Sequence, residues 1–321
     1  MADADPLAPA PPWHEPVRGG HPAPETMATT GLEQLRAMID GGTPRPPLFH
    51  LCGMRLTEVQ PGTATFAVPL TGWLRGTDGA IPIGPLTIPA DSAMACAVIA
   101  LLGPHTTIST TEMALRQVRP AEPGTTLLAR GTVLEPGPPL ALAEVSMIDS
   151  AGTLIAHGTS LCMHQPLAGA EGPGGGVAPS ASPGPDPWER DPGDGGLAQL
   201  TGLSCVSAGH GEAVCIMPAT RWLCAPPPGR AQGGTVALLA EAAITAAIHS
   251  APGAGRFSPL ELKINLLRPL ATDGRPASAH ARVVHSGRRI AVATAEVLDA
   301  AGRPVAVASG SAIALSALGG S

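Results

Sequence analysis

The feature of the sequence that most constrains the fold is an internal duplication. A series of landmarks in residues 53–152 returns in the same order in residues 202–302, at a spacing of about 150 residues throughout. Two long copies at one constant spacing indicate two homologous domains on one chain, because solenoids repeat at periods of about 20–50 residues. The first series is Gly53, Trp73-Leu74, Ala90-Asp91, Arg119-Pro120 and Asp149-Ser150-Ala151-Gly152, and the second is Gly202, Trp222-Leu223, Ala240-Glu241, Arg268-Pro269 and Asp299-Ala300-Ala301-Gly302.

Segments of biased composition separate the two copies from each other and from the start of the chain. Residues 1–28 are rich in proline, alanine and acids without periodicity, so we expect a disordered tail there. Residues 166–199 are rich in proline and glycine and are interpreted as a linker. These boundaries leave one domain over residues 29–165 and a second over residues 200–321.

Each copy predicts one buried helix followed by antiparallel strands. In the second copy, residues 235–249 are apolar on nearly every face of a helix, and residues 260–267 alternate with the period of a strand. In the first copy Pro85 and Pro89 obscure where the helix begins, and a start at Pro89 would put Asp91 in the first turn. A helix enclosed by a curled antiparallel sheet buries the apolar faces of both, which predicts an α+β fold class.

Composition excludes several classes of function. The chain is acidic, with a net charge of −6, and only 2% of its residues are aromatic, so nucleic-acid binding is not expected. The start of the chain lacks a basic, apolar signal sequence, and the longest apolar run is short and interrupted by Glu241. We therefore expect a cytoplasmic protein without a membrane partner. The six cysteines form no Cys-x-x-Cys pair, and no metal site is expected.

The ordered set of motifs resembles the hotdog fold, and specifically the PaaI-type acyl-CoA thioesterases. The resemblance covers residues 50–165 and 200–315 and implies two hotdog domains in tandem, joined as a pseudo-dimer. It also implies an acyl-CoA substrate without a further cofactor, and it leaves open a homodimer of double hotdogs. The second copy carries the best matches, which are Gly233-Gly234 with Glu241, the strand from Glu261 to Pro269, and the hairpin residues Val283–Arg288 and Asp299–Ala306.

Two departures from the family pattern affect the site. The family often has a histidine just before its Gly-Gly pair, and Gln232 stands there in this chain. In the first copy only Gly84 remains of that pair, and Pro85 follows it.

An acid on an otherwise apolar helix is the strongest candidate for function, and both copies have one. An unpartnered buried carboxylate costs several kcal/mol, so Asp91 and Glu241 are expected to have partners, to line a cleft or to serve catalysis. Hydrolysis of a thioester needs a base or nucleophile and a donor for the developing oxyanion. A helix start offers free N–H groups for the second role. The alternative is that both acids are structural polar groups between helices.

The spacing along each helix indicates how these groups combine. Gly84 precedes Asp91, and Gly234 precedes Glu241, by seven residues in each copy, which is about 10 Å along a helix. One carbonyl carbon cannot contact both groups of one helix. We therefore pair Asp91 with Gly234 and Gln232, and Glu241 with Gly84, as sites shared between the copies.

Hydroxyl groups next to the acids are candidates for holding the attacking water. Thr110 aligns with the position at which related enzymes place such a hydroxyl. In the second copy Pro259 occupies that position, with Ser258 beside it. The site of Asp91, Thr110 and Gly234 is therefore favoured over the site of Glu241, although both are open.

Basic residues gather in the second half of the chain, in contrast to the acidic first half. Arg288 and Arg289 align with a segment of the first copy that has no bases. They are candidates for contacts with the phosphates of coenzyme A. The alternative is an ordinary solvated surface.

These observations predict an acyl-CoA thioesterase that uses a carboxylate and water. A non-catalytic hotdog protein that binds acyl-CoA or another ligand is the main alternative. A hotdog hydratase ranks third, because neither Asp91 nor Glu241 has a closely spaced histidine.

Overall fold

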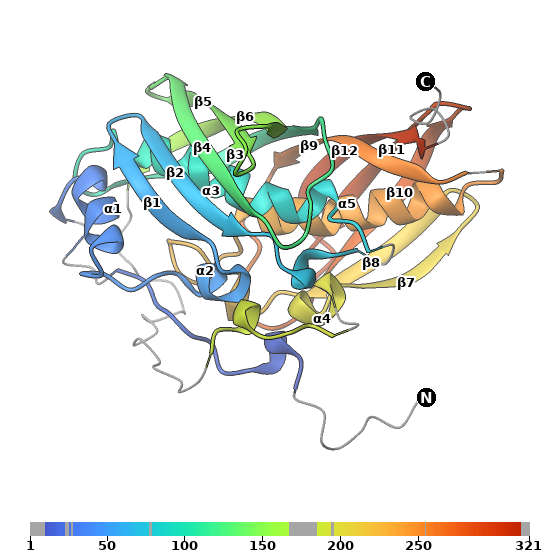
Figure 1. Cartoon of the computed structure of the whole chain (residues 1–321), viewed down its shortest axis with the longest axis horizontal. Coiled ribbons are helices and arrows are strands. Elements are labelled where there is room, and N and C mark those ends of the chain that lie inside the picture. Colours follow the sequence, from blue (N-terminus) through green and yellow to red (C-terminus); the bar gives the residue numbers. More distant parts are fainter. Residues whose placement is uncertain are drawn as a thin grey trace.

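The computed structural model describes residues 10–22, 26, 28–76, 79–166, 185–193, 196–253 and 255–315. Within these residues, a twelve-stranded antiparallel sheet curves around two long helices, α3 and α5 (Figure 1). The strand order is β1-β2-β4-β5-β6-β3-β9-β12-β11-β10-β8-β7, so two equivalent halves meet where β3 pairs with β9. The expected α+β fold of two hotdog domains joined as a pseudo-dimer is confirmed.

The two halves contain the same elements in the same order. Short helices α1 (Gly31–Ile39) and α2 (Pro47–Cys52) precede the first half, and α4 (Leu197–Thr201) precedes the second. The first half consists of β1 (Arg55–Gln60), β2 (Thr63–Pro69), α3 (Ile83–Ile99), β3 (Thr106–Gln117), β4 (Thr126–Glu135), β5 (Leu140–Ile148) and β6 (Leu154–Pro166). The second consists of β7 (Ser204–Gly209), β8 (Glu212–Pro218), α5 (Gly233–Ser250), β9 (Phe257–Leu266), β10 (Pro276–Ser286), β11 (Ile290–Leu298) and β12 (Pro304–Ala314).

Strand register shows how closely the halves correspond. Thr110 pairs with Cys162 in the first half, and a bulge follows it in β3. Pro259 pairs with Ala312 in the second half, again with a bulge next to it in β9. Thr110 and Pro259 are therefore equivalent in three dimensions, as their alignment in sequence predicted.

The two central helices pack directly against each other. Gly234 lies at the contact, where an added Cβ would be 2.5 Å from the carbonyl oxygen of Thr87. The Thr87 hydroxyl donates to the Gly234 carbonyl at 2.7 Å. Pro89 lies inside α3, which begins at Ile83, so Asp91 is about two turns from the helix start rather than in the first turn. Close contact of the helix backbones thus requires glycine at position 234.

Helix α5 is the longest helix of the described residues and is strongly apolar. By length and hydropathy alone it could cross a membrane, but 67% of it is buried inside the protein. Its side chains fill the space between α3 and the second half of the sheet. This burial is what a core helix of a folded domain shows.

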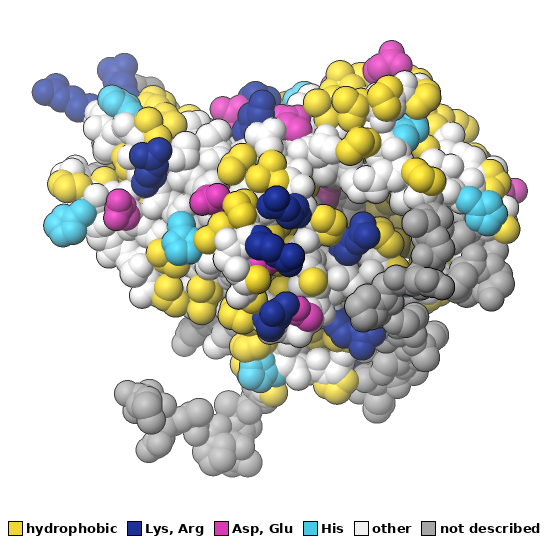
Figure 2. Space-filling model, turned by 180° about the vertical axis from the view of Figure 1, so that it is seen from behind, with side chains coloured by type: hydrophobic (Ala, Val, Ile, Leu, Met, Phe, Trp, Pro, Cys, Tyr) yellow, Lys and Arg dark blue, Asp and Glu magenta, His cyan; other side chains and the backbone are white. Residues whose placement is uncertain are grey.

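Ion pairs cross the junction between the two halves of the sheet. Arg116 pairs with Glu261 at 2.7 Å, and Lys263 pairs with Glu112 at 3.4 Å. From behind, basic side chains gather in the middle of the molecule with acidic ones beside them (Figure 2). Because the basic side chain of each pair is exposed to solvent, we expect each pair to contribute less than about 1 kcal/mol.

The expected disordered tail is wrong for residues 10–22, which lie against the second domain and are called the N-terminal strap. Its short helix η1 (Pro12–His14) packs on α4, and Trp13 covers Gly202. The Trp222 indole donates to the Glu15 carbonyl at 3.1 Å. Composition suggested disorder, but tryptophan and proline bury enough apolar surface to fix this segment. Residues 1–9 lie outside the described residues.

The end of the expected linker forms a matching segment, residues 185–193, called the linker strap. Its short helix η4 (Pro187–Glu189) packs on α2, and Trp188 covers Gly53. The Trp73 indole donates to the Arg190 carbonyl at 2.8 Å. Each strap thus precedes one domain and packs on the other. The linker residues 167–184 and 194–195 lie outside the described residues.

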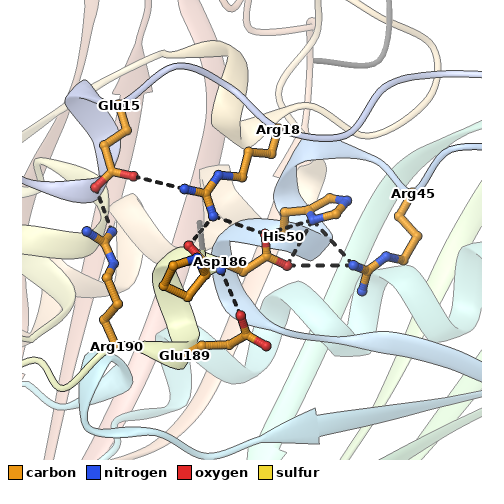
Figure 3. Close-up of polar contacts among 8 residues, drawn as sticks. Glu15, Arg18, Arg45, His50, Asp186, Glu189 and Arg190 are labelled. Atoms are coloured by element: carbon orange, nitrogen blue, oxygen red, sulfur yellow. Dashed lines mark hydrogen bonds and ion pairs between the residues drawn. The ribbon is translucent and has the colours of Figure 1, made fainter. Parts of the chain in front are cut away.

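A polar cluster joins the two straps (Figure 3). Arg190 pairs with Glu15 at 2.6 Å, and Arg18 pairs with Asp186 at 3.5 Å. Asp186 also accepts a contact from His50 Nδ1 at 2.9 Å. Burial, followed by the charge of Arg45, lowers the pKa of His50, although Asp186 opposes this shift. These contacts hold the two domains together on the side opposite the strand junction.

Candidate functional site

The Asp91 carboxylate lies between the two copies of the repeat. Oδ1 accepts a hydrogen bond from the Thr110 hydroxyl at 2.8 Å, and Oδ2 accepts one from the Gly234 N–H at 3.1 Å. Thr110 belongs to β3 of the same copy, and Gly234 belongs to the first turn of α5 in the other. The structure therefore brings together the three groups that the sequence analysis combined.

The Asp91 carboxyl is 3% exposed. Burial raises its pKa, and the hydrogen bonds from Thr110, Gly234 and Gly233 oppose this rise. A carboxylate with a raised pKa is a stronger base toward water than an exposed one. The partially positive start of α5 stabilises negative charge at the same place.

Gln232 lies at the N-cap of α5, where its side chain turns to the helix that carries the carboxylate. Its amide nitrogen donates to the Ile88 carbonyl at 2.9 Å and to the Ser92 hydroxyl at 3.1 Å. Its amide oxygen is buried without a hydrogen-bond partner among the described residues. Gln232 therefore ties the start of α5 to the turn of α3 that carries Asp91, and it leaves one acceptor unused.

The Glu241 carboxylate is the counterpart of Asp91 and lies against the start of α3. A Cβ on Gly84 would be 2.6 Å from Glu241 Oε2, so the expected pairing of these two residues agrees with the geometry. The hydroxyl that donates to Oε1, at 2.6 Å, comes from Thr245, one turn further along α5. Sequence analysis missed Thr245, although an acid and a threonine four residues apart on one helix is a readable signal.

Ser258 was expected to supply the hydroxyl for Glu241. It lies at the beginning of β9, half-buried, with Ile313 of β12 as its register partner. The equivalent of Thr110 is its neighbour Pro259, which carries no hydroxyl. The second acid thus accepts a hydrogen bond from a hydroxyl of its own helix, whereas the first accepts one from a hydroxyl of the sheet.

The two helix starts differ as oxyanion sites. In the first turn of α5 the N–H groups of Gly233 and Gly234 face Asp91, whereas the Thr235 N–H donates to the Gln232 carbonyl at 3.0 Å. The first turn of α3 contains Pro85, which has none. The start of α5, which faces Asp91, therefore presents two adjacent glycine N–H groups, whereas the start of α3, which faces Glu241, has Pro85 directly after Gly84.

Arg288 and Arg289 lie in the turn between β10 and β11, both exposed. The Ala314 N–H donates to the Arg289 carbonyl, and Ala314 pairs with Phe257 just after α5 ends. The turn therefore lies beside the C-terminal end of α5, whereas Asp91 faces the N-terminal end. The structure does not bring the two arginines to the acids.

A groove of about 960 Å³ lies elsewhere, on the outer face of the second half of the sheet. His280, Arg282 and Glu296 line it, and all three are exposed. Other residues of β10, such as Ala277 and Ala279, are buried on the side of α5 instead. Because the sheet separates the groove from both acids, a thioester bound in the groove would not reach either carboxylate.

A metal site needs several ligand side chains close together. Among the residues that the structure describes, no group of three or more His, Cys, Asp or Glu side chains is arranged to hold an ion. The groups that the site offers for chemistry are Asp91, Glu241, their hydroxyl partners and the two helix starts.

The sequence of the second domain matches a known family. The profile of the thioesterase superfamily matches residues 229–306, which include α5 and most of the second domain. No curated protein matches the chain.

Solved structures match nearly the whole chain. A candidate thioesterase from Novosphingobium aromaticivorans is 17% identical, with a TM-score of 0.55, over 80% of this chain and 99% of its own. The tesB protein of Mycobacterium avium subsp. paratuberculosis is 11% identical, with a TM-score of 0.54, over 88% and 99%. A candidate thioesterase II from Thermobifida fusca is 19% identical, with a TM-score of 0.52, over 81% and 94%. At these identities the likeness shows the double hotdog fold.

Proposed function

We propose that this tandem hotdog protein, whose second domain matches the thioesterase superfamily, is a PaaI-like acyl-CoA thioesterase that releases a free acid and coenzyme A. The observation that carries the proposal is the Asp91 carboxylate, buried between the Thr110 hydroxyl and the Gly234 N–H. A buried acid, a hydroxyl and a helix start from two different copies are the groups that hydrolysis of a thioester needs.

In the proposed mechanism Asp91 is the general base. It takes a proton from a water molecule, which Thr110 helps to position, and the hydroxide attacks the thioester carbonyl carbon. The carbonyl oxygen becomes an oxyanion and accepts hydrogen bonds from the N–H groups at the start of α5. The carbon–sulfur bond then breaks, and the proton held by Asp91 goes to the leaving thiolate.

Substrate binding has to change one contact of the free protein. The Gly234 N–H donates to Asp91 at 3.1 Å, so the thioester oxygen must take this donor over when it arrives. The carboxylate is then freed from one hydrogen bond and becomes a better base. Arg288 and Arg289 are the proposed contacts for the CoA phosphates, at the far end of α5.

A non-catalytic protein that binds acyl-CoA is the second candidate. It is favoured by the same hydrogen bond, because in the free protein Asp91 already fills the position that an oxyanion would occupy. This candidate predicts saturable binding of CoA esters without release of the thiol.

A panel of CoA esters from acetyl to palmitoyl, with aromatic acyl groups, separates the two candidates. Hydrolysis is followed by the loss of thioester absorbance rather than with a thiol reagent, because Cys205 is exposed and would react. The double variant Asp91→Asn with Glu241→Gln is the matched control. We expect turnover by the natural chain and none by the double variant. Full activity of that variant would overturn the mechanism, and binding without turnover by the natural chain would favour the second candidate.

A further inference from the structure

Two cysteines face each other across the hairpin of β7 and β8. Cys205 and Cys215 are direct register partners in this antiparallel pair, so their side chains lie on the same face of the sheet. Both are free thiols. Cys205 is exposed at the edge of the sheet, and Cys215 is 1% exposed.

The first copy shows that the fold does not require cysteine here. The equivalent pair across β1 and β2 is Leu56 with Phe66, at 7% and 0% exposure. Helix α1 packs on β1 and covers that edge. The second copy therefore has a pair of thiols where the first has an apolar contact.

The distance between register partners suits a disulfide. Directly opposite residues of antiparallel strands have Cα atoms about 4.5–5.5 Å apart, within the range of about 4.4–6.8 Å that disulfides adopt. A bulge next to Cys205, before Ser207, gives the edge strand room to adjust. The other cysteines, at positions 52, 96, 162 and 224, are buried.

The two thiols have different chemical roles. Burial, followed by the neighbouring Cys205, raises the pKa of Cys215, so this thiol stays protonated and is a poor first target for an oxidant. Cys205 is the accessible member. An exposed thiol beside a buried partner is the arrangement in which the second resolves the oxidised form of the first.

We propose that Cys205 and Cys215 form a reversible disulfide when the protein meets hydrogen peroxide. The Cys205 thiolate attacks one peroxide oxygen, the O–O bond breaks, and Cys205 becomes a sulfenic acid with release of water once the hydroxide is protonated. The Cys215 sulfur then attacks the Cys205 sulfur, its proton and the hydroxyl leave as water, and the S–S bond forms. In the net reaction, each sulfur loses one electron, and the peroxide is reduced to two water molecules.

The disulfide would act on the second half of the molecule. Cys215 lies within electrostatic reach of Glu241, and β7 also packs on α5. The bond fixes the edge strand β7 to its neighbour β8. It also converts two thiols in the neighbourhood of Glu241 to a disulfide. The Asp91 site, on the other side of the helix pair, keeps its contacts.

The test uses the full chain, folded, with hydrogen peroxide followed by alkylation of the remaining thiols. Cleavage after Arg190 and Arg221 leaves both cysteines on one peptide, so a second cut after Glu212 is needed. The peptides 191–212 and 213–221 are then expected to remain joined until a reductant separates them. The intact chain should lose two hydrogen atoms and gain thermal stability.

Control variants keep the result interpretable. Cys224→Ser, at another buried thiol, should still form the joined peptide, and Cys205→Ser should abolish it and leave Cys215 alkylatable after unfolding. Oxidation of Cys205 to the sulfinic or sulfonic acid, without joined peptides in the natural chain, would overturn the proposal. This outcome does not depend on thioesterase activity, because the measurement follows mass alone.

Discussion

The Asp91 and Glu241 sites occupy equivalent places but are built from different parts. Asp91 receives a hydroxyl from the sheet through Thr110, and it faces a helix start with two adjacent glycines. Glu241 receives a hydroxyl from its own helix through Thr245, and it faces a helix start that contains Pro85. Once both halves lie on one chain, each site can change without changing the other. The comparison indicates two equivalent buried acids whose hydroxyl partners and opposing helix starts have diverged.

Substitutions at the two helix starts are expected to give the largest difference between the two sites. Gly234→Ala should destabilise the protein by about 3 kcal/mol and abolish turnover, because the new Cβ meets the α3 backbone at 2.5 Å. Gly84→Ala should cost only about 1 kcal/mol, since the new Cβ meets the movable ends of the Glu241 and Leu238 side chains. Urea unfolding of both variants gives the comparison. Equal losses of stability would contradict it.

Substitutions at the two hydroxyls, Thr110 and Thr245, compare the contributions of the two sites to kcat. Thr110→Val should lower kcat by about 10–100-fold with little change in KM, because the hydroxyl positions the base and the water. Thr110→Ser should restore most of this loss. Thr245→Val should leave kcat nearly unchanged if the Glu241 site contributes little. Steady-state kinetics on the best CoA ester distinguishes these outcomes, and a larger effect at Thr245 than at Thr110 would reverse the assignment.

The two straps allow a matched test of structure. Trp13→Ala and Trp188→Ala should each cost about 2–3 kcal/mol, because each tryptophan covers a glycine of the opposite domain. Similar losses in thermal or urea unfolding would support equivalent roles for the straps. A variant without effect would show that its strap contributes little to joining the domains.

The N-terminal strap contains a histidine of lowered pKa and should therefore respond to acid. Burial, followed by the charge of Arg221, lowers the pKa of His21 in the N-terminal strap to about 4 from the ordinary 6.5. Between these values the unfolded chain binds more protons, so stability falls as pH drops from about 6.5 toward 4, by at most about 2 kcal/mol at pH 5. His21→Gln should flatten this part of the stability curve. Urea unfolding at pH 7 and pH 5 gives the loss of unfolding free energy between the two pH values. An equal loss in His21→Gln and in the natural chain would exclude His21 as the source of that loss.

Much of this architecture could be predicted from the sequence because each element of the domain occurs twice, so the pattern in one copy could be checked against the other. The pairing of Asp91 with Gly234 followed from helix rise together with the tandem arrangement that the family resemblance implied, and the alignment of Thr110 with Pro259 agrees with the strand register. These inferences depend on local spacing, which the sequence contains.

The parts that sequence analysis missed depend on contacts between distant segments. The N-terminal strap was predicted to be a disordered tail, because its composition does not indicate that Trp13 packs against Gly202 of the second domain. Thr245 was overlooked because the search for a hydroxyl followed the position of Thr110 in the sheet. The Cys205–Cys215 pair needed the strand register, since residues ten apart in sequence face each other only in a hairpin of this length.

The most direct test of the central claim compares Asp91→Asn with Glu241→Gln, each alone, on the CoA ester that the natural chain hydrolyses best. Both substitutions keep the size of the side chain, and circular dichroism and urea unfolding would check that each variant is folded. The account predicts that Asp91→Asn lowers kcat/KM by about 10²–10⁴-fold, the usual contribution of a general base, and that Glu241→Gln lowers it by about threefold or less. Turnover by Asp91→Asn at the rate of the natural chain would contradict the account.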